Sequence, residues 1–148
     1  MKKQTVWMPL ILMAVFGLGI VPTKAQSSYS IRAEVPFDFI VGSKTLPAGK
    51  ITARKMSSSE AGPMEISNLK NGQVALRLGQ RMSSTDTSEI GKLVFRKYGN
   101  RYYLAQVWIP GYKAMEINKS SSERAVENEL RVAKNLKPQV VTVFAGTQ

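Results

Sequence analysis

Apolar and polar residues alternate along much of the chain after position 28. A period of two is typical of a strand with one face buried and one exposed. Pro36 cannot donate a backbone hydrogen bond, so it marks a break between two such segments. Further strands are expected at 50–56 and at 140–144. The apolar positions that define the first two segments are Ile31, Ala33, Val35, Phe37, Phe39 and Val41.

A hairpin is expected at 64–78, on either side of an Asn-Gly pair. A two-residue loop would place an arginine opposite Ile66, whereas a three-residue loop pairs Ile66 with Leu76 and Met64 with Leu78. Because a slip of one residue reverses every side chain, the three-residue loop is the one that gathers the apolar residues. It requires a positive φ at Gly72.

The segments 92–98 and 101–109 predict a second hairpin, which turns at Gly99 and Asn100. Both faces of this hairpin are apolar, so it lies centrally or has another element packed outside it. The alternation places Leu93 and Phe95 on one face and Val94 on the other. In the second strand it places Tyr103, Val107 and Ile109 on one face and Leu104 and Trp108 on the other.

One helix is predicted at about 121–136. Ser120 and Glu123 have the spacing of a capping box. Val126, Leu130 and Ala133 then recur at helical spacing, and Pro138 stops the helix. The apolar face of this helix is expected to cover the second hairpin.

These elements predict an all-β domain, mainly an antiparallel sandwich or barrel, with one helix of the C-terminal half packed against it. The alternation fits a sandwich and a barrel equally well. About 120 residues follow the leader described next, which is the usual length of one domain, 26–148.

The N-terminus has the pattern of a secretory signal peptide. Lys2 and Lys3 precede an apolar run at 6–21, which is shorter than the roughly 20 residues that cross a bilayer. Thr23 and Ala25 supply the small side chains that signal peptidase needs. The leader is therefore predicted to be 1–25, with cleavage between Ala25 and Gln26, and the protein to be exported to the periplasm or beyond. Because the chain has no cysteine, it is not expected to be a lipoprotein.

The composition excludes several kinds of chemistry. The chain contains no cysteine and no histidine. Disulfides, thiolate catalysis, Cys/His zinc sites and Ser-His-Asp triads are therefore impossible within it. No cofactor or metal is expected, and an enzyme would have to use carboxylates, lysine, tyrosine or serine.

The charge favours anionic partners. The chain has 21 basic and 10 acidic residues, and three of the basic residues are the lysines of the leader. The mature chain would thus have 18 basic and 10 acidic residues, a net charge of +8. Such a charge favours polysaccharide, lipid head groups or nucleic acid, although it also serves solubility. Nucleic acid is not expected as a partner of an exported protein with no recognisable nucleic-acid-binding module.

Three stretches of the sequence resemble a family of small exported bacterial proteins. They are VPFDFIVG with LPAGK at 35–50, LVFRKYGNRYYLAQVW at 93–108 and KSSSERAVENEL at 119–130. The resemblance implies export and a mainly β domain. No activity is assigned to this family, so the resemblance implies no functional residue.

The sequence contains only weak matches to catalytic motifs. An S-x-x-K motif at 67–70 lacks the helix and the larger domain that this chemistry needs. Four carboxylates could in principle serve a glycosidase, but the sequence gives no sign that they pair. They are Asp38, Glu65, Asp86 and Glu89. The protein is therefore expected not to be an enzyme.

The tip of the second hairpin is the best candidate for a binding site. Arg96, Lys97 and Arg101 alternate there with Tyr98 and Tyr102. Interleaved cations and aromatic rings can hold an anionic group and stack on a sugar.

The expected role is non-enzymatic binding or a structural role at the cell envelope or outside the cell. The expected partner is an anionic glycan, a lipid surface or another envelope protein. A small-ligand carrier with a barrel cavity is the first alternative, and a carboxylate-based glycan hydrolase is the second.

Overall fold

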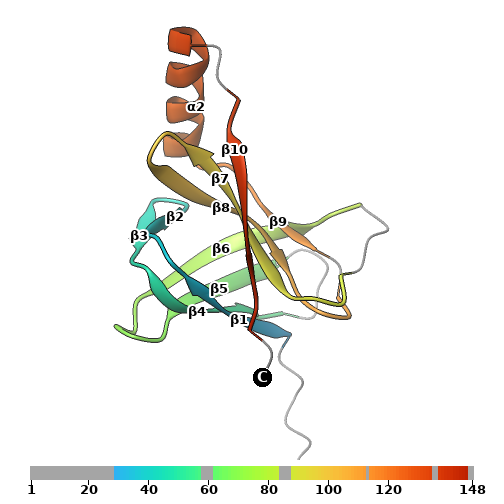
Figure 1. Cartoon of the computed structure of the whole chain (residues 1–148). Coiled ribbons are helices and arrows are strands. Elements are labelled where there is room, and N and C mark those ends of the chain that lie inside the picture. Colours follow the sequence, from blue (N-terminus) through green and yellow to red (C-terminus); the bar gives the residue numbers. More distant parts are fainter. Residues whose placement is uncertain (1–28, 58–61, 84–87, 113, 135–136, 147–148) are drawn as a thin grey trace, which may run out of the picture.

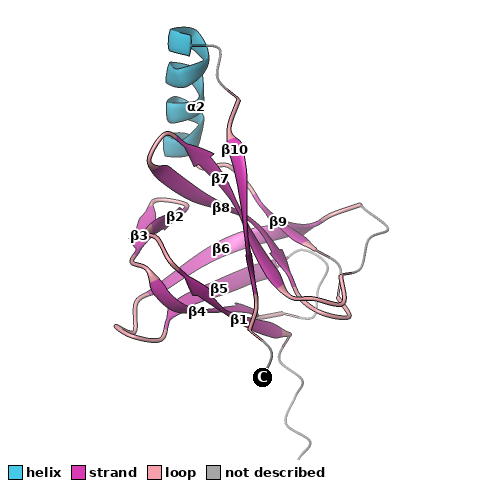
Figure 2. Ribbon diagram, in the orientation of Figure 1, coloured by secondary structure: helices cyan, strands magenta, loops and turns pink. Residues whose placement is uncertain are grey.

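The computed structural model describes residues 29–57, 62–83, 88–112, 114–134 and 137–146. Within them, ten strands form one sheet and one helix lies in the C-terminal half (Figures 1 and 2). The expected β domain with a late helix is thus confirmed. The elements are β1 (Ser30–Val35), β2 (Phe39–Val41), β3 (Lys44–Leu46), β4 (Gly49–Lys55), β5 (Gly62–Asn68), β6 (Val74–Arg81), β7 (Lys92–Tyr98), β8 (Arg101–Trp108), β9 (Met115–Ile117), α2 (Ser121–Lys134) and β10 (Gln139–Phe144). The predicted leader and the predicted cleavage between Ala25 and Gln26 lie outside the described residues. No helix of the described part is long and apolar enough to cross a membrane.

The sheet curls so that its first and last strands meet. The pairs run β1-β4-β5-β6-β9-β8, and β8 continues through β7 to β10. All of these pairs are antiparallel, and the β2–β3 hairpin attaches to β8 through a short parallel contact. The end of β10 comes beside β1 (Figure 1), where Ala33 bridges Ala145 and Gly146 N donates to Arg32 O at 3.1 Å. At this seam a Cβ on Gly91 would lie only 2.9 Å from Ile31.

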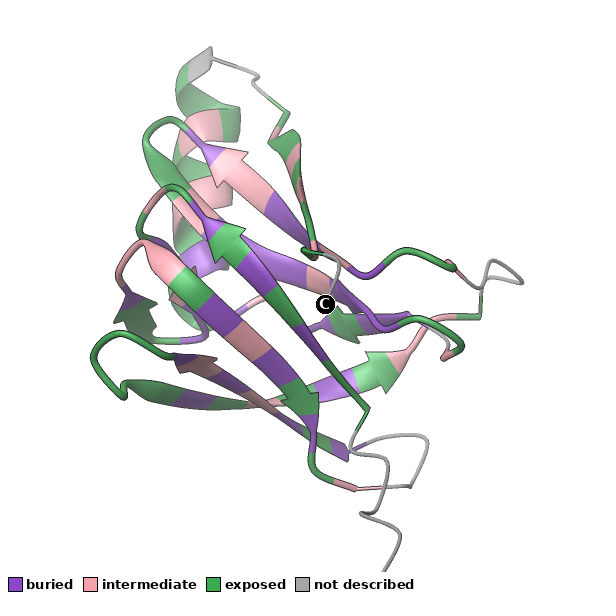
Figure 3. Ribbon diagram, turned by 60° about the horizontal axis from the view of Figure 1, so that its bottom comes forward, coloured by how far each residue is buried: buried purple, intermediate pink, exposed green. Residues whose placement is uncertain are grey.

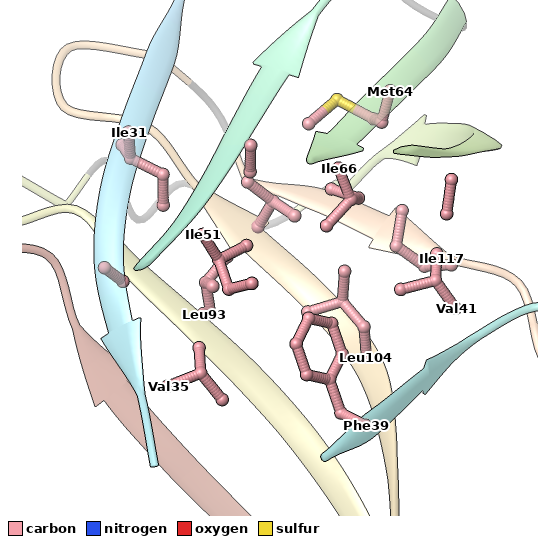
Figure 4. Packing of buried hydrophobic residues seen from close by; sticks show 14 of the residues in the cluster. Ile31, Val35, Phe39, Val41, Ile51, Met64, Ile66, Leu93, Leu104 and Ile117 are labelled. Carbon is pink, nitrogen blue, oxygen red and sulfur yellow. The ribbon is translucent and has the colours of Figure 1, made fainter. Parts of the chain in front are cut away.

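The alternation predicted for the first strands is confirmed. Ile31, Ala33 and Val35 are buried, and the residues between them are exposed. Figure 3 shows the same alternation along the neighbouring strands. The buried side chains fill the space inside the curled sheet (Figure 4), where the rings of Phe39 and Phe95 meet edge to face at 5.2 Å.

The β7–β8 hairpin turns at Gly99 and Asn100 as predicted, with Tyr98 opposite Arg101. The two faces of β8 are divided differently from the prediction. The register shifts after Val94, so that Leu104 and Val107 both lie in the core. A bulge uses one extra residue and reverses the alternation beyond it.

The register predicted for the β5–β6 hairpin is wrong by one residue. Ile66 lies opposite Ala75, and Met64 lies opposite Arg77. The loop has four residues, because Gly72 N donates to Asn68 O at 2.9 Å and Asn68 N donates to the carbonyl of residue 73. Gly72 has the predicted positive φ, at 69°.

Side-chain volume explains this register. Ile66 and Met64 are large and fully buried, and the inward positions of β6 include the small residues Ala75, opposite Ile66, and Gly79. A Cβ on Gly79 would lie 3.1 Å from Met115 and 3.2 Å from Met64. Had the predicted register formed, Gln80 would take the place of Gly79 opposite Gly62, and its side chain would compete with these methionines for the same space.

The register can be tested with two substitutions on β6. Gly79→Leu is expected to destabilise the domain by about 1–3 kcal/mol through overpacking. Leu78→Ser should change the stability by less than about 0.5 kcal/mol, because Leu78 is 68% exposed. Urea unfolding of both variants measures this. A larger loss of stability for Leu78→Ser than for Gly79→Leu would instead support the register predicted from the sequence.

The helix begins where predicted but does not cover the hairpin along its length. Its first turns lie against β7, and the rest extends away from the sheet (Figure 1). Val126 and Leu130 are half-buried, whereas Ala133, expected on the buried face, is exposed. Residues 135–136, expected to end the helix, lie outside the described residues.

Candidate anion-binding site

Arg96 lies on the face of the β7–β8 hairpin that receives the helix. Its Nε donates to Glu123 Oε1 at 2.6 Å, and its Nη2 donates to Ile117 O at 3.2 Å. The side chains of Arg96 and Glu123 are only 13% and 3% exposed. Arg96 therefore ties the start of α2 to β7.

Tyr98 shares this environment. It is buried, and its hydroxyl donates to Glu123 Oε1 at 3.3 Å. Burial and the nearby Glu123 and Glu127 carboxylates raise the pKa of Tyr98 above its usual range. Its ring meets Tyr103 edge to face at 5.7 Å. The hydroxyl and much of the ring are thus already engaged within the protein.

The capping box predicted at the start of α2 is only half formed. Glu123 N donates to Ser120 Oγ at 3.2 Å, as the motif requires. The Glu123 carboxylate points to Arg96 and Tyr98. The sequence motif located the helix start but not the second use of its glutamate.

Lys97 and Tyr102 lie opposite each other on β7 and β8. The Lys97 ammonium is 5.4 Å from the centre of the Tyr102 ring, which stacks on Phe37 at 3.9 Å. Tyr102 therefore has one face covered. Arg101 is exposed beside the turn. The five candidate residues thus divide into an anchoring pair, Arg96 and Tyr98, and a more open group, Lys97, Arg101 and Tyr102.

The β7–β8 turn, α2 and the start of β10 come together at one end of the sheet (Figure 1). A groove of about 250 Å³ is lined by residues of these three elements and by Lys137. It brings a second lysine, Lys137, to the same place as Lys97, because Gln139 of β10 lies opposite Lys97. No carboxylate of the described residues forms an ion pair with Lys97, Lys137 or Arg101. The lining consists of Lys97, Tyr98, Gly99, Asn100, Leu130, Lys137 and Gln139.

The sequence prediction missed Asn100, Leu130, Lys137 and Gln139 as members of this site. Lys137 and Gln139 follow the helix, about 40 residues after Lys97, and only the β7–β10 pairing brings them close. The last strand was predicted, but nothing local in the sequence said which strand it joins.

The candidate carboxylates are engaged separately. Asp38 accepts a hydrogen bond from Ala48 N at 2.8 Å, and Glu65 pairs with Arg54 at 2.9 Å. Glu89 is exposed, and Asp86 lies outside the described residues. In the described part of the chain, no group of three or more Asp and Glu residues could hold a metal ion.

No family model, curated protein or solved structure matches this chain. The function proposed below therefore rests on the residues of the chain itself.

Proposed function

We propose that this chain is an exported, non-enzymatic β domain that binds an anionic glycan in the groove between the β7–β8 turn, α2 and β10. The observation that carries the proposal is the pair of lysines in the groove, Lys97 and Lys137, with Arg101 at the adjoining turn. Export is part of the proposal and rests on the leader at 1–25.

The groove has the chemistry that such a ligand needs. The two lysines and the arginine can hold a sulfate, phosphate or carboxylate group through charge-assisted hydrogen bonds. Asn100 and Gln139 supply neutral donors and acceptors for sugar hydroxyls. Leu130 supplies an apolar surface beside them. Buried Arg96 and Tyr98 position the groove by fixing α2 to β7, and they are not assigned to the ligand.

The proposal includes the finer description of the fold as a barrel. The ring of strand pairs and the β1–β10 seam favour a barrel over a sandwich. Its interior is filled by side chains such as Phe39, Phe95 and Met64, which are fully buried. No comparable observation favours the carrier or the glycan hydrolase.

Binding should be measured by calorimetry with a chain that begins at Gln26, which retains all ten strands. Heparin serves as the sulfated probe and dextran as the neutral one. We expect heparin to bind at low salt and to weaken steeply near 0.15 M, where charges beyond about 8 Å are screened. Lys97→Glu/Lys137→Glu should weaken binding by about tenfold or more, equivalent to about 1.4 kcal/mol.

The matched control is Arg32→Glu/Lys92→Glu, which changes the net charge equally at residues outside the groove lining. It should weaken heparin binding by less than about threefold, through long-range charge alone. Absence of heparin binding at low salt would refute the proposal. Equal losses in both double variants would assign the binding to net charge.

A further inference from the structure

Strand β6 presents its apolar residues to solvent. Val74, Leu76 and Leu78 are 40%, 60% and 68% exposed. The inward positions between them hold Ala75 and Arg77. A strand with one buried face normally has the opposite arrangement.

Packing holds β6 in this orientation. Gly79 has too little room for a larger residue between Met64 and Met115. The Arg77 side chain covers Gly42, where a Cβ would lie 2.8 Å from Arg77 Nε. Val74, Leu76 and Leu78 therefore cannot turn inward without dismantling the sheet. Because they add little to the core, polar residues would serve the fold as well at these positions.

Lysines surround one end of this strand. Leu69, 54% exposed, lies in the β5–β6 loop next to Lys70, and Leu69 N donates to Lys50 O at 2.9 Å. The Lys44 ammonium donates to Val74 O at 2.7 Å. A groove of about 490 Å³, lined in part by Lys50, Leu69 and Lys70, opens beside the loop. The β6 patch is defined here as Leu69, Val74, Leu76 and Leu78 with Lys44, Lys50 and Lys70.

The composition and size of the β6 patch indicate its partner. Protein interfaces are enriched in aromatic residues and arginine and depleted in lysine, the reverse of this patch. Covering its four aliphatic side chains would remove at most about 400 Å² from water. A standard protein interface needs about 800 Å² on each side. Two copies of the patch would also bring like charges together.

We propose that the β6 patch docks the domain on an anionic phospholipid membrane. The aliphatic side chains enter the boundary between head groups and acyl chains, and the lysines contact lipid phosphates. Each lysine near an anionic surface strengthens the attraction to that surface. This docking surface is separate from the glycan groove and goes beyond the proposed function.

The test is co-sedimentation of the chain from Gln26 with phosphatidylglycerol/phosphatidylcholine vesicles at low salt. Wild type should bind these vesicles and bind pure phosphatidylcholine at least about fivefold more weakly, since the lysines then lose their anionic partners. Leu76→Ser/Leu78→Ser and Lys50→Glu/Lys70→Glu should each weaken vesicle binding by about tenfold. Heparin binding by the serine variant should stay unchanged, which separates this proposal from the glycan groove.

The control is Val132→Ser/Val140→Ser, because these valines are 86% and 70% exposed outside the β6 patch. It should bind vesicles as wild type does, and circular dichroism melts confirm that every variant folds. The proposal is overturned if wild type does not bind the anionic vesicles or if the control loses as much binding as the patch variants. It is also overturned if Lys97→Glu/Lys137→Glu alone abolishes vesicle binding, or if wild type is a dimer that Leu76→Ser/Leu78→Ser dissociates.

Discussion

Arg96→Met is expected to destabilise the domain by about 3–5 kcal/mol, because it leaves the Glu123 carboxylate buried without its cationic partner. Glu123 is 3% exposed, and among the described residues its other side-chain partner is the neutral Tyr98 hydroxyl. The loss should be read from urea unfolding followed by circular dichroism and by tyrosine fluorescence. Both signals should shift to lower urea together if α2 and the sheet unfold as one unit.

Two further variants separate the buried pair from the loss of charge itself. Arg54→Met removes an ion pair with Glu65 in which Arg54 is 45% exposed, and it should cost less than about 1 kcal/mol. Arg96→Met/Glu123→Met removes both buried charges and should recover a large part of the stability lost by Arg96→Met. If Arg96→Met and Arg54→Met had equal effects, the Arg96–Glu123 pair would not anchor the helix.

Phe95→Ala is also expected to cost about 3–5 kcal/mol, through lost burial and an unfilled cavity. Phe95 is fully buried, and its ring meets both Phe37 and Phe39 edge to face at 5.2 Å. It thus connects the segment before β2 to the centre of the sheet. Urea unfolding measures the loss of stability.

Phe144→Ala is the matched control, because it removes the same ring from a side chain that is 62% exposed on β10. Its effect should stay below about 1 kcal/mol. A comparable loss at both positions would mean that Phe95 is not the centre of the core.

The parts of the fold that were predictable depend on residues close in sequence. The alternation of β1 and the turn at Gly99 and Asn100 follow from local backbone geometry, and both were predicted correctly. The capping serine located the start of α2 for the same reason. Such features need no knowledge of what packs across from them.

The errors arose where a distant side chain decides the outcome. Matching apolar residues across the β5–β6 hairpin favoured Leu76 opposite Ile66, but Met115 of another strand and Met64 leave room only for a glycine further along β6, at Gly79. The bulge near Ala105 leaves no mark in the alternation of β8. Sequence patterns record polarity, whereas register depends on volume as well.

The candidate site was foreseen in part. The sequence indicated the β7–β8 turn as a cluster of cations and aromatic rings. It could not separate Arg96, held by Glu123, from Lys97, which lines the groove. Lys137 was missed because only the pairing of β10 with β7 brings it close to Lys97. That pairing depends on the whole sheet and not on the residues next to Lys137.

The seam between β1 and β10 sets the order in which the chain can fold. Ala33 and Ala145 stand near opposite ends of the described chain, so their contact has a high loop-closure entropy and is expected to form late. Until β10 has been synthesised, β7 lacks one neighbour and the ring of strands stays open. A growing chain therefore cannot close the ring of strands until residues 139–145 have been added, and its partly formed sheet keeps two open edges until then.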